Sequence, residues 1–265
     1  MDNALQGQRA LVSGSTAGIG YAIAAALAQR GAHVIINGRT QGRVDDALQR
    51  LRREAGTAGN FDGIAADVGS AAGVQAIADR YRDVDILINN AGIFAVQPFL
   101  ESTDEQWEMF YRVNVLSGVR LSRAYLGGML QRNRGRIIFI SSESGVQIPA
   151  EMVHYGMTKA AQIAVARGLA QLTAGTAVTV NSVLPGPTRS EGVGTFVAEF
   201  AAKQGVSAAE FEKQFFRSAR PTSLLKRFTE PREIADVVAF VASPAASAIN
   251  GAAVRAEGGV VLSAF

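Results

Sequence analysis

Short apolar runs alternate with helix-length stretches along most of the chain. The apolar runs predict strands at Arg9–Ser13, His33–Asn37, Phe61–Ala65, Ile86–Asn89, Arg136–Ile140, Val178–Val183 and Ala252–Ala256. The stretches between them predict helices at Gly18–Arg30, Gln41–Glu54, Ala71–Arg80, Asp104–Gln131, Tyr155–Leu172 and Pro231–Ala242. Each return to a parallel strand needs a crossover, and strands without alternating polar positions are covered on both faces. The predicted fold class is therefore α/β, a doubly wound Rossmann-type parallel sheet of about seven strands.

Residues 191–228 interrupt this alternation with two amphipathic stretches. Phe196 and Phe200, and again Phe211 and Phe215, are spaced i, i+4, which places each pair on one helix face. Six of the 13 phenylalanines of the chain fall in this segment. Because no linker, low-complexity tract or internal repeat marks a second domain, we predict a single domain over residues 1–265.

Composition excludes several classes of protein. Apolar residues make up 48% and charged residues 18% of the chain, which is typical of a globular protein. Neither a membrane span nor a signal peptide is expected, because apolar runs are short and the N-terminal residues lack a basic and apolar leader pattern. The absence of cysteine and the 121 positions between His33 and His154 argue against a metal site. The net charge is only +3 and no basic run is longer than two residues, so the sequence does not indicate a nucleic-acid-binding protein. A cytoplasmic location is expected.

A glycine-rich turn joins the first predicted strand to an alanine-rich helix. The turn reads Gly14-Ser15-Thr16-Ala17-Gly18-Ile19-Gly20. Glycines permit a tight turn and a close approach to a pyrophosphate, whose charge the helix N-terminus compensates. The GxxxGxG spacing differs from the commoner GxGxxG fingerprint. The turn indicates a dinucleotide site, with an ordinary strand-to-helix turn as the alternative.

The second predicted strand ends at Asn37-Gly38-Arg39, where an enzyme preferring NAD(H) usually has an acid for the ribose hydroxyl. Arg39 offers a fixed charge and several donors to a 2′-phosphate, and Arg43 lies one helical turn further on. Without a carboxylate, nothing repels that phosphate. The sequence favours NADP(H), with NAD(H) as the alternative if both arginines only solvate the start of a helix.

Polar residues follow two further strands, at the edge where the ligand crevice of a doubly wound sheet lies. They are Asn89-Asn90-Ala91-Gly92 and Ser141-Ser142. Further on, the i, i+4 spacing of Tyr155 and Lys159 puts a phenol and an ammonium on one helix face. A nearby cation favours an ionised phenol, which makes tyrosine usable as an acid or base near neutral pH.

Taken together and in this order, these features resemble the short-chain dehydrogenase/reductase family along nearly the whole chain. The matching features are Gly14-x3-Gly18-Ile19-Gly20, Asp67-Val68, Asn89-Asn90-Ala91-Gly92, Asn114, Ser142, Tyr155-x3-Lys159, Asn181 and Pro185-Gly186. Ser142 precedes Tyr155 by 13 positions, the spacing of the family. The chain also looks like the 3-oxoacyl carrier-protein reductase branch, whose fold is shared by enzymes with other substrates.

The resemblance implies a role for each of four catalytic residues. Tyr155 would exchange a proton with the substrate oxygen, and Ser142 would hydrogen-bond that oxygen. Lys159 would lower the pKa of the tyrosine and bind the nicotinamide ribose, and Asn114 would hold a water that connects the lysine to solvent. These roles suit an oxygen that gains negative charge as hydride is transferred.

The resemblance also implies a set of cofactor contacts. They are Gly14, Ser15, Thr16, Gly18, Ile19, Gly20, Arg39, Asp67, Val68, Asn89, Ala91, Gly92, Tyr155, Lys159, Pro185, Gly186 and Thr188. Asp67 and Val68 would contact adenine, Asn89 the neighbouring ribose, and the backbone around Thr188 the carboxamide. The implied protein is an NADP(H)-dependent oxidoreductase, a homotetramer that acts on a small carbonyl compound or secondary alcohol.

The implied substrate lid is the segment 191–228, whose phenylalanines suggest an apolar or amphiphilic substrate. We expect this lid to be mobile without ligand, with permanent core packing as the alternative. A catalytically silent NADPH sensor is the alternative function, and the complete set of Asn114, Ser142, Tyr155 and Lys159 argues against it.

Three neighbours of the motifs carry further expectations. Strand alternation should turn Ser141 away from Ser142. His154 could face a substrate, but an exposed histidine at the start of a helix is the favoured interpretation. The aromatic and methionine residues between Trp107 and Tyr111 are expected to pack in a core or an interface.

Overall fold

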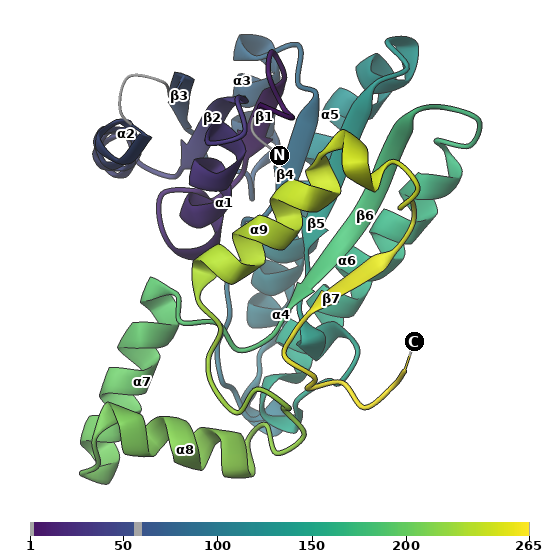
Figure 1. Ribbon diagram of the computed structural model, residues 1–265. Coiled ribbons are helices and arrows are strands. Elements are labelled where there is room, and N and C mark those ends of the chain that lie inside the picture. The colour runs from purple at the N-terminus through teal and green to yellow at the C-terminus, as the bar shows by residue number, and fades with distance from the viewer. Residues whose placement is uncertain (1–2, 56–59, 265) are drawn as a thin grey trace.

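A parallel sheet forms the centre of the computed structural model, which describes residues 3–55 and 60–264 (Figure 1). In these ranges seven strands pair in the order β3-β2-β1-β4-β5-β6-β7, and every pairing is parallel. The strands are β1 (Arg9–Val12), β2 (His33–Gly38), β3 (Asn60–Ala65), β4 (Ile86–Asn89), β5 (Gly135–Ile140), β6 (Val178–Pro185) and β7 (Ala253–Ala256). All residues of β6 are buried, as expected for a strand covered on both faces. The predicted doubly wound α/β fold is confirmed.

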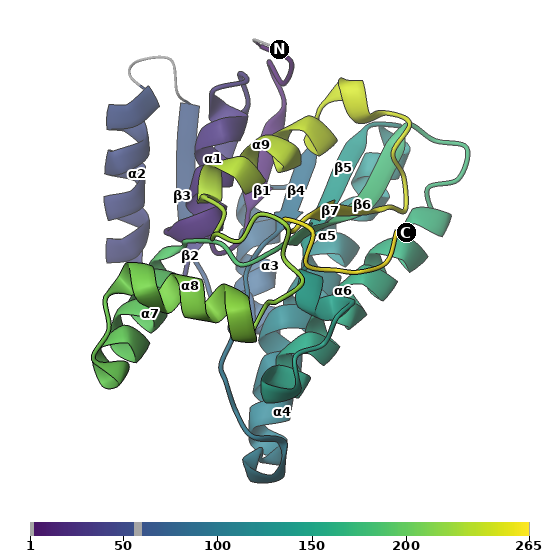
Figure 2. The same cartoon turned by 60° about the horizontal axis from the view of Figure 1, so that its bottom comes forward.

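Helices cover both faces of the sheet (Figure 2), because right-handed crossovers that run in opposite directions along the sheet place their helices on opposite faces. One face packs on α1 (Gly18–Ala28), α2 (Gln41–Ala55) and α9 (Pro231–Ala242). The other packs on α3 (Ala71–Arg80), α5 (Ser117–Gln131) and α6 (Val153–Gln171). Among the described residues, no helix combines the length and the apolar character needed to cross a membrane.

The strand order reverses between β1 and its neighbour β4, which leaves a crevice at the carboxyl ends of these strands. The glycine-rich turn leaves β1 at this edge, and the Asn89-Asn90-Ala91-Gly92 motif leaves β4 beside it. Asn90 Nδ2 donates hydrogen bonds to the carbonyl oxygens of Ser13 and Gly14, at 3.0 and 2.9 Å. The two motifs are thus joined directly.

The helix predicted over Asp104–Gln131 is not continuous. The structure divides it into α4 (Asp104–Tyr111), a π-helical turn over Arg112–Leu116, and α5. Asn114 lies in this turn, and its backbone carbonyl accepts a hydrogen bond from Gln162 Nε2 at 2.6 Å. Single π-turns inside α-helices often occur at functional sites, and this one places a buried amide group against the loop after β4.

The segment 191–228 projects from the body at the same edge as the crevice (Figures 1 and 2). It forms α7 (Glu191–Gln204) and α8 (Ala208–Ser218). Phe211, Phe216 and Phe228 are buried against each other and against side chains of α7. The spacing of Phe211 and Phe215 predicted this helix face correctly, whereas the side chains of Phe196 and Phe200 lie outside the described part of the structure.

Candidate active site

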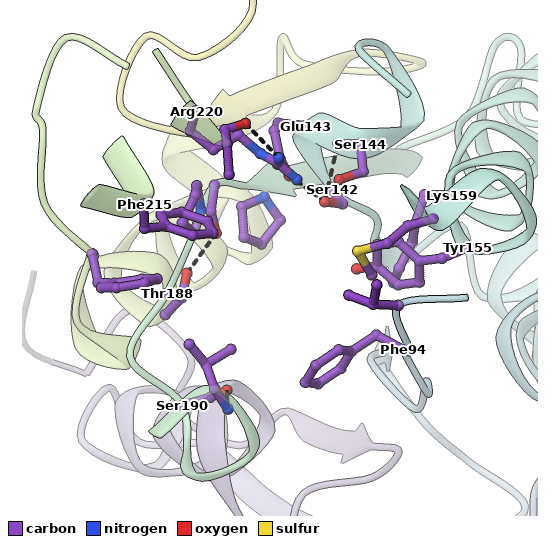
Figure 3. A pocket seen from close by; sticks show the side chains of 18 of the residues that line it. Phe94, Ser142, Glu143, Ser144, Tyr155, Lys159, Thr188, Ser190, Phe215 and Arg220 are labelled. Atoms are coloured by element: carbon purple, nitrogen blue, oxygen red, sulfur yellow. Dashed lines mark hydrogen bonds and ion pairs between the residues drawn. The ribbon is translucent and has the colours of Figure 1, made fainter. Parts of the chain in front are cut away.

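A cavity of about 520 Å³ opens at the carboxyl ends of the strands (Figure 3). The glycine turn, the β4 and β5 exits, the start of α6, and α7 and α8 all contribute to its wall. Ser142, Tyr155 and Lys159 line it together with Phe94 and Phe215. The cavity is large enough for a small molecule and combines an apolar wall with a few convergent polar groups.

The two serines after β5 point to different places, as strand alternation predicts. Ser141 Oγ donates to the backbone carbonyl of Lys159 at 2.8 Å, so its hydroxyl is committed to the body of the protein. Ser142 Oγ accepts from the backbone N–H of Ser144 at 3.1 Å and donates to Glu143 Oε2. Its hydroxyl is therefore the one placed at the cavity wall.

Tyr155 and Lys159 lie one turn apart in α6, which begins at Val153, two residues before the tyrosine. The Lys159 ammonium is 5.5 Å from the centre of the Tyr155 ring and donates to the carbonyl of Ile140 at 2.9 Å. The i, i+4 spacing thus brings the two groups together as predicted, and Figure 3 shows both beside Ser142.

The pKa of Tyr155 is not lowered in this structure, contrary to expectation. Burial raises it well above its ordinary value and the Glu143 carboxylate raises it further, while a hydrogen bond with Ser142 and the charge of Arg220 oppose the change. Burial also lowers the pKa of Lys159 to about 8, against the influence of Glu143. Desolvation disfavours the charged form of each group. Burial therefore favours the protonated phenol and opposes the ionisation that the sequence predicted.

Asn114 is fully buried, and its side chain is committed to neighbouring groups. Its Oδ1 accepts from the backbone N–H of Ile93 at 2.8 Å, and its Nδ2 donates to the Ile93 carbonyl and to Thr158 Oγ1. These bonds tie the strand exit after β4 to α6. In the structure Asn114 connects the loop after β4 to the helix that carries Lys159. Its implied role in holding a water stays a prediction.

The glycine turn forms a cradle that side chains would fill. Gly14 and Gly18 have φ values of +62° and +57°, in the left-handed region. A Cβ on Gly14 would stand 2.9 Å from Cα of Ala91, and one on Gly20 would stand 2.4 Å from Nδ2 of Asn90. Glycine at these positions therefore lets the turn pack against the loop after β4, directly before the N-terminus of α1, where backbone N–H groups can bind a pyrophosphate. This geometry fits a dinucleotide cofactor.

The β2 exit lies against this cradle, because Asn37 Oδ1 accepts from the N–H of Gly14 at 3.3 Å. Ser15 is fully buried, and its hydroxyl donates to the Val12 carbonyl at 2.7 Å, so its side chain stabilises the turn. Arg39 is exposed at the end of β2, next to the partly exposed Thr16. The predicted contact of Arg39 with a phosphate on the adenosine ribose stays a prediction.

Asn89 and Asn90 have opposite orientations. Asn89 is buried, and its Nδ2 donates to Ser122 Oγ of α5 at 3.1 Å, away from the cavity. Asn90 lines the cavity, although the sequence analysis assigned it no role. The predicted contact of Asn89 with the adenosine ribose stays a prediction, and its side-chain amide group is bonded to α5 in this structure.

The other predicted cofactor contacts surround the same edge. Asp67 is exposed and accepts from the N–H of Gly69 at 2.9 Å, while Val68 is buried. Ile19, Gly92, Pro185, Gly186 and Thr188 all line the cavity. Thr188 Oγ1 is 2.9 Å from Thr229 Oγ1, which joins the chain after β6 to the end of the lid.

Two charged residues that the sequence did not single out also line the cavity. Glu143 is 4% exposed, and Nε of Arg220, just after α8, donates to its Oε1 at 2.9 Å. The two residues are 77 positions apart in the sequence, so no local pattern could have paired them. The position of Glu143 directly after the predicted catalytic Ser142 was the only available signal.

His154 is buried, not exposed. It is 2% exposed, its ring centre lies 4.1 Å from that of Phe110 and 6.2 Å from that of Trp107, and burial lowers its pKa. The packing of α4 on the start of α6 covers it, which the position at a helix start did not reveal. Phe110 packs in the interior as expected, whereas Met109 and Tyr111 are exposed.

Comparisons with known proteins agree with this geometry. Residues 8–206 match the family model described as short chain dehydrogenase. The chain is 45% identical to the uncharacterized oxidoreductase YvaG of Bacillus subtilis (strain 168), over 98% of each chain. It is 34% identical to the 3-oxoacyl-[acyl-carrier-protein] reductase FabG of Vibrio cholerae serotype O1, over 97% of this chain and 99% of the relative.

Solved structures give the same result. L-sorbose reductase from Gluconobacter frateurii, complexed with NADPH and L-sorbose, superposes with a TM-score of 0.92 at 29% identity, over 99% of this chain and 100% of that one. A single-residue variant of the actinorhodin polyketide ketoreductase, solved with NADPH, has a TM-score of 0.85 at 31% identity, over 98% of this chain and 99% of that one.

A parallel sheet with a dinucleotide cradle beside a serine, a tyrosine and a lysine defines an oxidoreductase that acts on alcohol and carbonyl groups. The chain belongs to the short-chain dehydrogenase/reductase family.

Proposed function

We propose that the protein is an NADP(H)-dependent reductase of a small carbonyl compound, with Tyr155 as the proton donor. The observation that carries the proposal is the convergence of Ser142, Tyr155 and Lys159 on one wall of the cavity. Two hydroxyl groups on that wall, those of Ser142 and Tyr155, support the direction of reduction, because a carbonyl oxygen gains negative charge and takes up a proton in that direction.

Different residues of this chain have different roles in the proposed reaction. Ser142 donates a hydrogen bond to the carbonyl oxygen, and Tyr155 gives that oxygen its proton. Lys159 supplies a positive charge beside the phenol, which stabilises negative charge as it develops there. Asn114 fixes α6 relative to the exit of β4. The lid side chain of Phe215 closes the apolar wall and limits access of water.

The cradle of Gly14, Gly18 and Gly20 would hold the pyrophosphate of the cofactor, and Arg39 and Thr16 would meet its ribose phosphate. Bound there, NADPH supplies the hydride that reduces the substrate carbon. Two of the structural relatives were solved with NADPH, which supports the choice of this cofactor. The absence of an acid beside Arg39 supports it independently.

The test is incubation of the protein with NADPH and a broad panel of ketones, followed as loss of nicotinamide absorbance. We expect reduction of at least one class of ketone. A protein that binds NADPH tightly and reduces no ketone would be the catalytically silent sensor instead. The complete residue set argues against that alternative, because a sensor needs no proton donor.

We also propose that the lid moves as a unit. Phe211, Phe216 and Phe228 pack against each other, so α7 and α8 share a small core of their own. Such a unit can shift without exposing its interior. Hydrogen exchange of residues 193–219 should slow when NADPH and a substrate analogue are added together. Strong protection that ligands leave unchanged would show that the segment is a fixed wall.

The protein is further proposed to be a cytoplasmic homotetramer. Met109 and Tyr111 on α4 are 39% and 43% exposed, and Leu172 after α6 is 62% exposed. Apolar side chains on neighbouring helices are typical of subunit contacts, and closed symmetry is usual for homo-oligomers. Light scattering at micromolar concentration should give a mass four times that of one chain. A monomer under these conditions would contradict the proposal.

A further inference from the structure

A buried ion pair lies inside the cavity, beside the serine that would bind the carbonyl. The side chains of Glu143 and Arg220 are only 5% and 11% exposed. Arg220 Nη1 also lies 3.6 Å from Oε1 of Glu151 at the cavity rim. Burying two charges is costly, so their presence in a largely apolar cavity calls for an explanation. The proton transfer proposed above uses neither of them.

Glu143 accepts the only hydrogen bond that the Ser142 hydroxyl can donate. A serine hydroxyl carries one donor, and here Ser142 Oγ donates it to Glu143 Oε2 while accepting from the N–H of Ser144. Ser142 must therefore turn its proton away from Glu143 before it can donate to a substrate carbonyl. That rotation leaves Glu143 Oε2 without its donor in a desolvated position, which is unfavourable.

A substrate hydroxyl can restore the lost hydrogen bond. Ser142 Oγ and Glu143 Oε2 are in hydrogen-bond contact, so a pair of substrate oxygens only about 2.8 Å apart can bond to both of them at once. Gauche oxygens on adjacent carbons have a separation of this size. A carboxylate offers about four acceptor sites, so Oε2 can accept from a substrate hydroxyl while Oε1 keeps its bond to Arg220.

We propose that Glu143 binds a hydroxyl group on the carbon next to the substrate carbonyl, so that the substrates are α-hydroxy ketones and the products vicinal diols. Arg220 holds the carboxylate in place from the lid, as Figure 3 shows. The inference rests on the proposed reductase function. A site built to bond a substrate hydroxyl rejects analogues that lack it, because its own polar group is then left unpaired. Phe215, whose ring centre lies 5.8 Å from the Arg220 guanidinium carbon, suits an apolar remainder of the substrate.

The native protein provides the first test, with matched ketones and NADPH. Phenacyl alcohol is compared with its methyl ether, which keeps the electron-withdrawing oxygen but cannot donate, and with propiophenone. Hydroxyacetone and methoxyacetone form a second pair. We expect kcat/KM for the hydroxy ketone to exceed that for its ether by about 10- to 100-fold, the range for a hydrogen bond to a charged group. Equal values within each pair overturn the inference while leaving the reductase function intact.

Variants then assign the preference to Glu143. The double variant Glu143→Leu with Arg220→Met removes both charges and leaves neither unpaired, so it should fold. The ratio of kcat/KM for the hydroxy ketone to that for its methyl ether should fall to about threefold or less, because no carboxylate remains to accept a hydrogen bond from the substrate hydroxyl. Glu143→Gln, a weaker neutral acceptor, should retain part of the preference. Circular dichroism and the melting temperature establish that each variant is folded.

Glu151→Gln is the matched control, since Glu151 contacts Arg220 but not Ser142 and is half-exposed. It should keep the native preference. If the double variant keeps the native preference for hydroxy ketones, the assignment to Glu143 is overturned. If the native protein prefers the methyl ethers, the assignment is overturned as well. A native protein that binds NADPH but reduces none of these or other ketones refutes the reductase function as well.

Discussion

Replacing Tyr155 with phenylalanine should remove nearly all reduction of a verified ketone substrate and leave NADPH binding almost unchanged. The substitution deletes only the phenol oxygen, which in the proposed reaction bonds to the substrate and not to the pyrophosphate of the cofactor. General acid–base groups typically contribute about 10²- to 10⁴-fold to a rate, and the loss should be at least that large. Steady-state kinetics and a fluorescence titration with NADPH measure the two quantities separately.

Tyr111→Phe is the matched control for this experiment. Tyr111 is 43% exposed on α4 and is not part of the cavity wall, so the same loss of a hydroxyl should leave kcat unchanged. If Tyr155→Phe kept more than about a tenth of the native activity, another group would have to give the proton. The Ser142 hydroxyl, already engaged with Glu143, would then be the first to examine.

The sheet could be predicted well because each strand is a short apolar run that can be recognised from the local sequence alone. The strand predicted at Ile86–Asn89 has the same bounds in the structure, and the other strands differ by only one or two residues at an end. The π-helical turn at Arg112–Leu116 could not be predicted in the same way. Hydrogen bonds from Asn114 to Ile93 and Thr158 accompany it, and these partners lie far from it in the sequence.

Within the site, regular spacing predicted neighbours on one helix, but it could not predict on which side a buried residue faces. Tyr155 and Lys159 meet because a helix repeats every 3.6 residues. Ser15, in the glycine-rich turn, and Asn89, at the end of β4, have side chains that bond to the protein interior. His154 is covered by the aromatic residues of α4, a contact that only the tertiary fold creates. The pairing of Glu143 with Arg220 depends on how the lid docks on the body.

Replacing Arg39 with aspartate should weaken NADPH binding and shift the preference toward NADH. Arg39 is exposed at the end of β2 beside Thr16, where a 2′-phosphate would lie above the glycine cradle. A hydrogen bond to a charged group is worth about 1.5–3 kcal/mol, which corresponds to a roughly 10- to 150-fold increase in Kd. An aspartate would also repel the phosphate and could accept a hydrogen bond from an unmodified ribose, so NADH binding should hold or improve.

Arg53→Asp provides the matched control for this change, because it makes the same change of charge in the last turn of α2, remote from the cradle. Titration of each variant with NADPH and NADH, at fixed ionic strength, separates a local contact from a general effect of charge. We expect Arg53→Asp to leave the ratio of the two dissociation constants close to the native value, while Arg39→Asp lowers the preference for NADPH by at least about tenfold. Equal catalytic efficiency of the native protein with both cofactors would contradict the prediction, because Arg39 would then only solvate the start of α2.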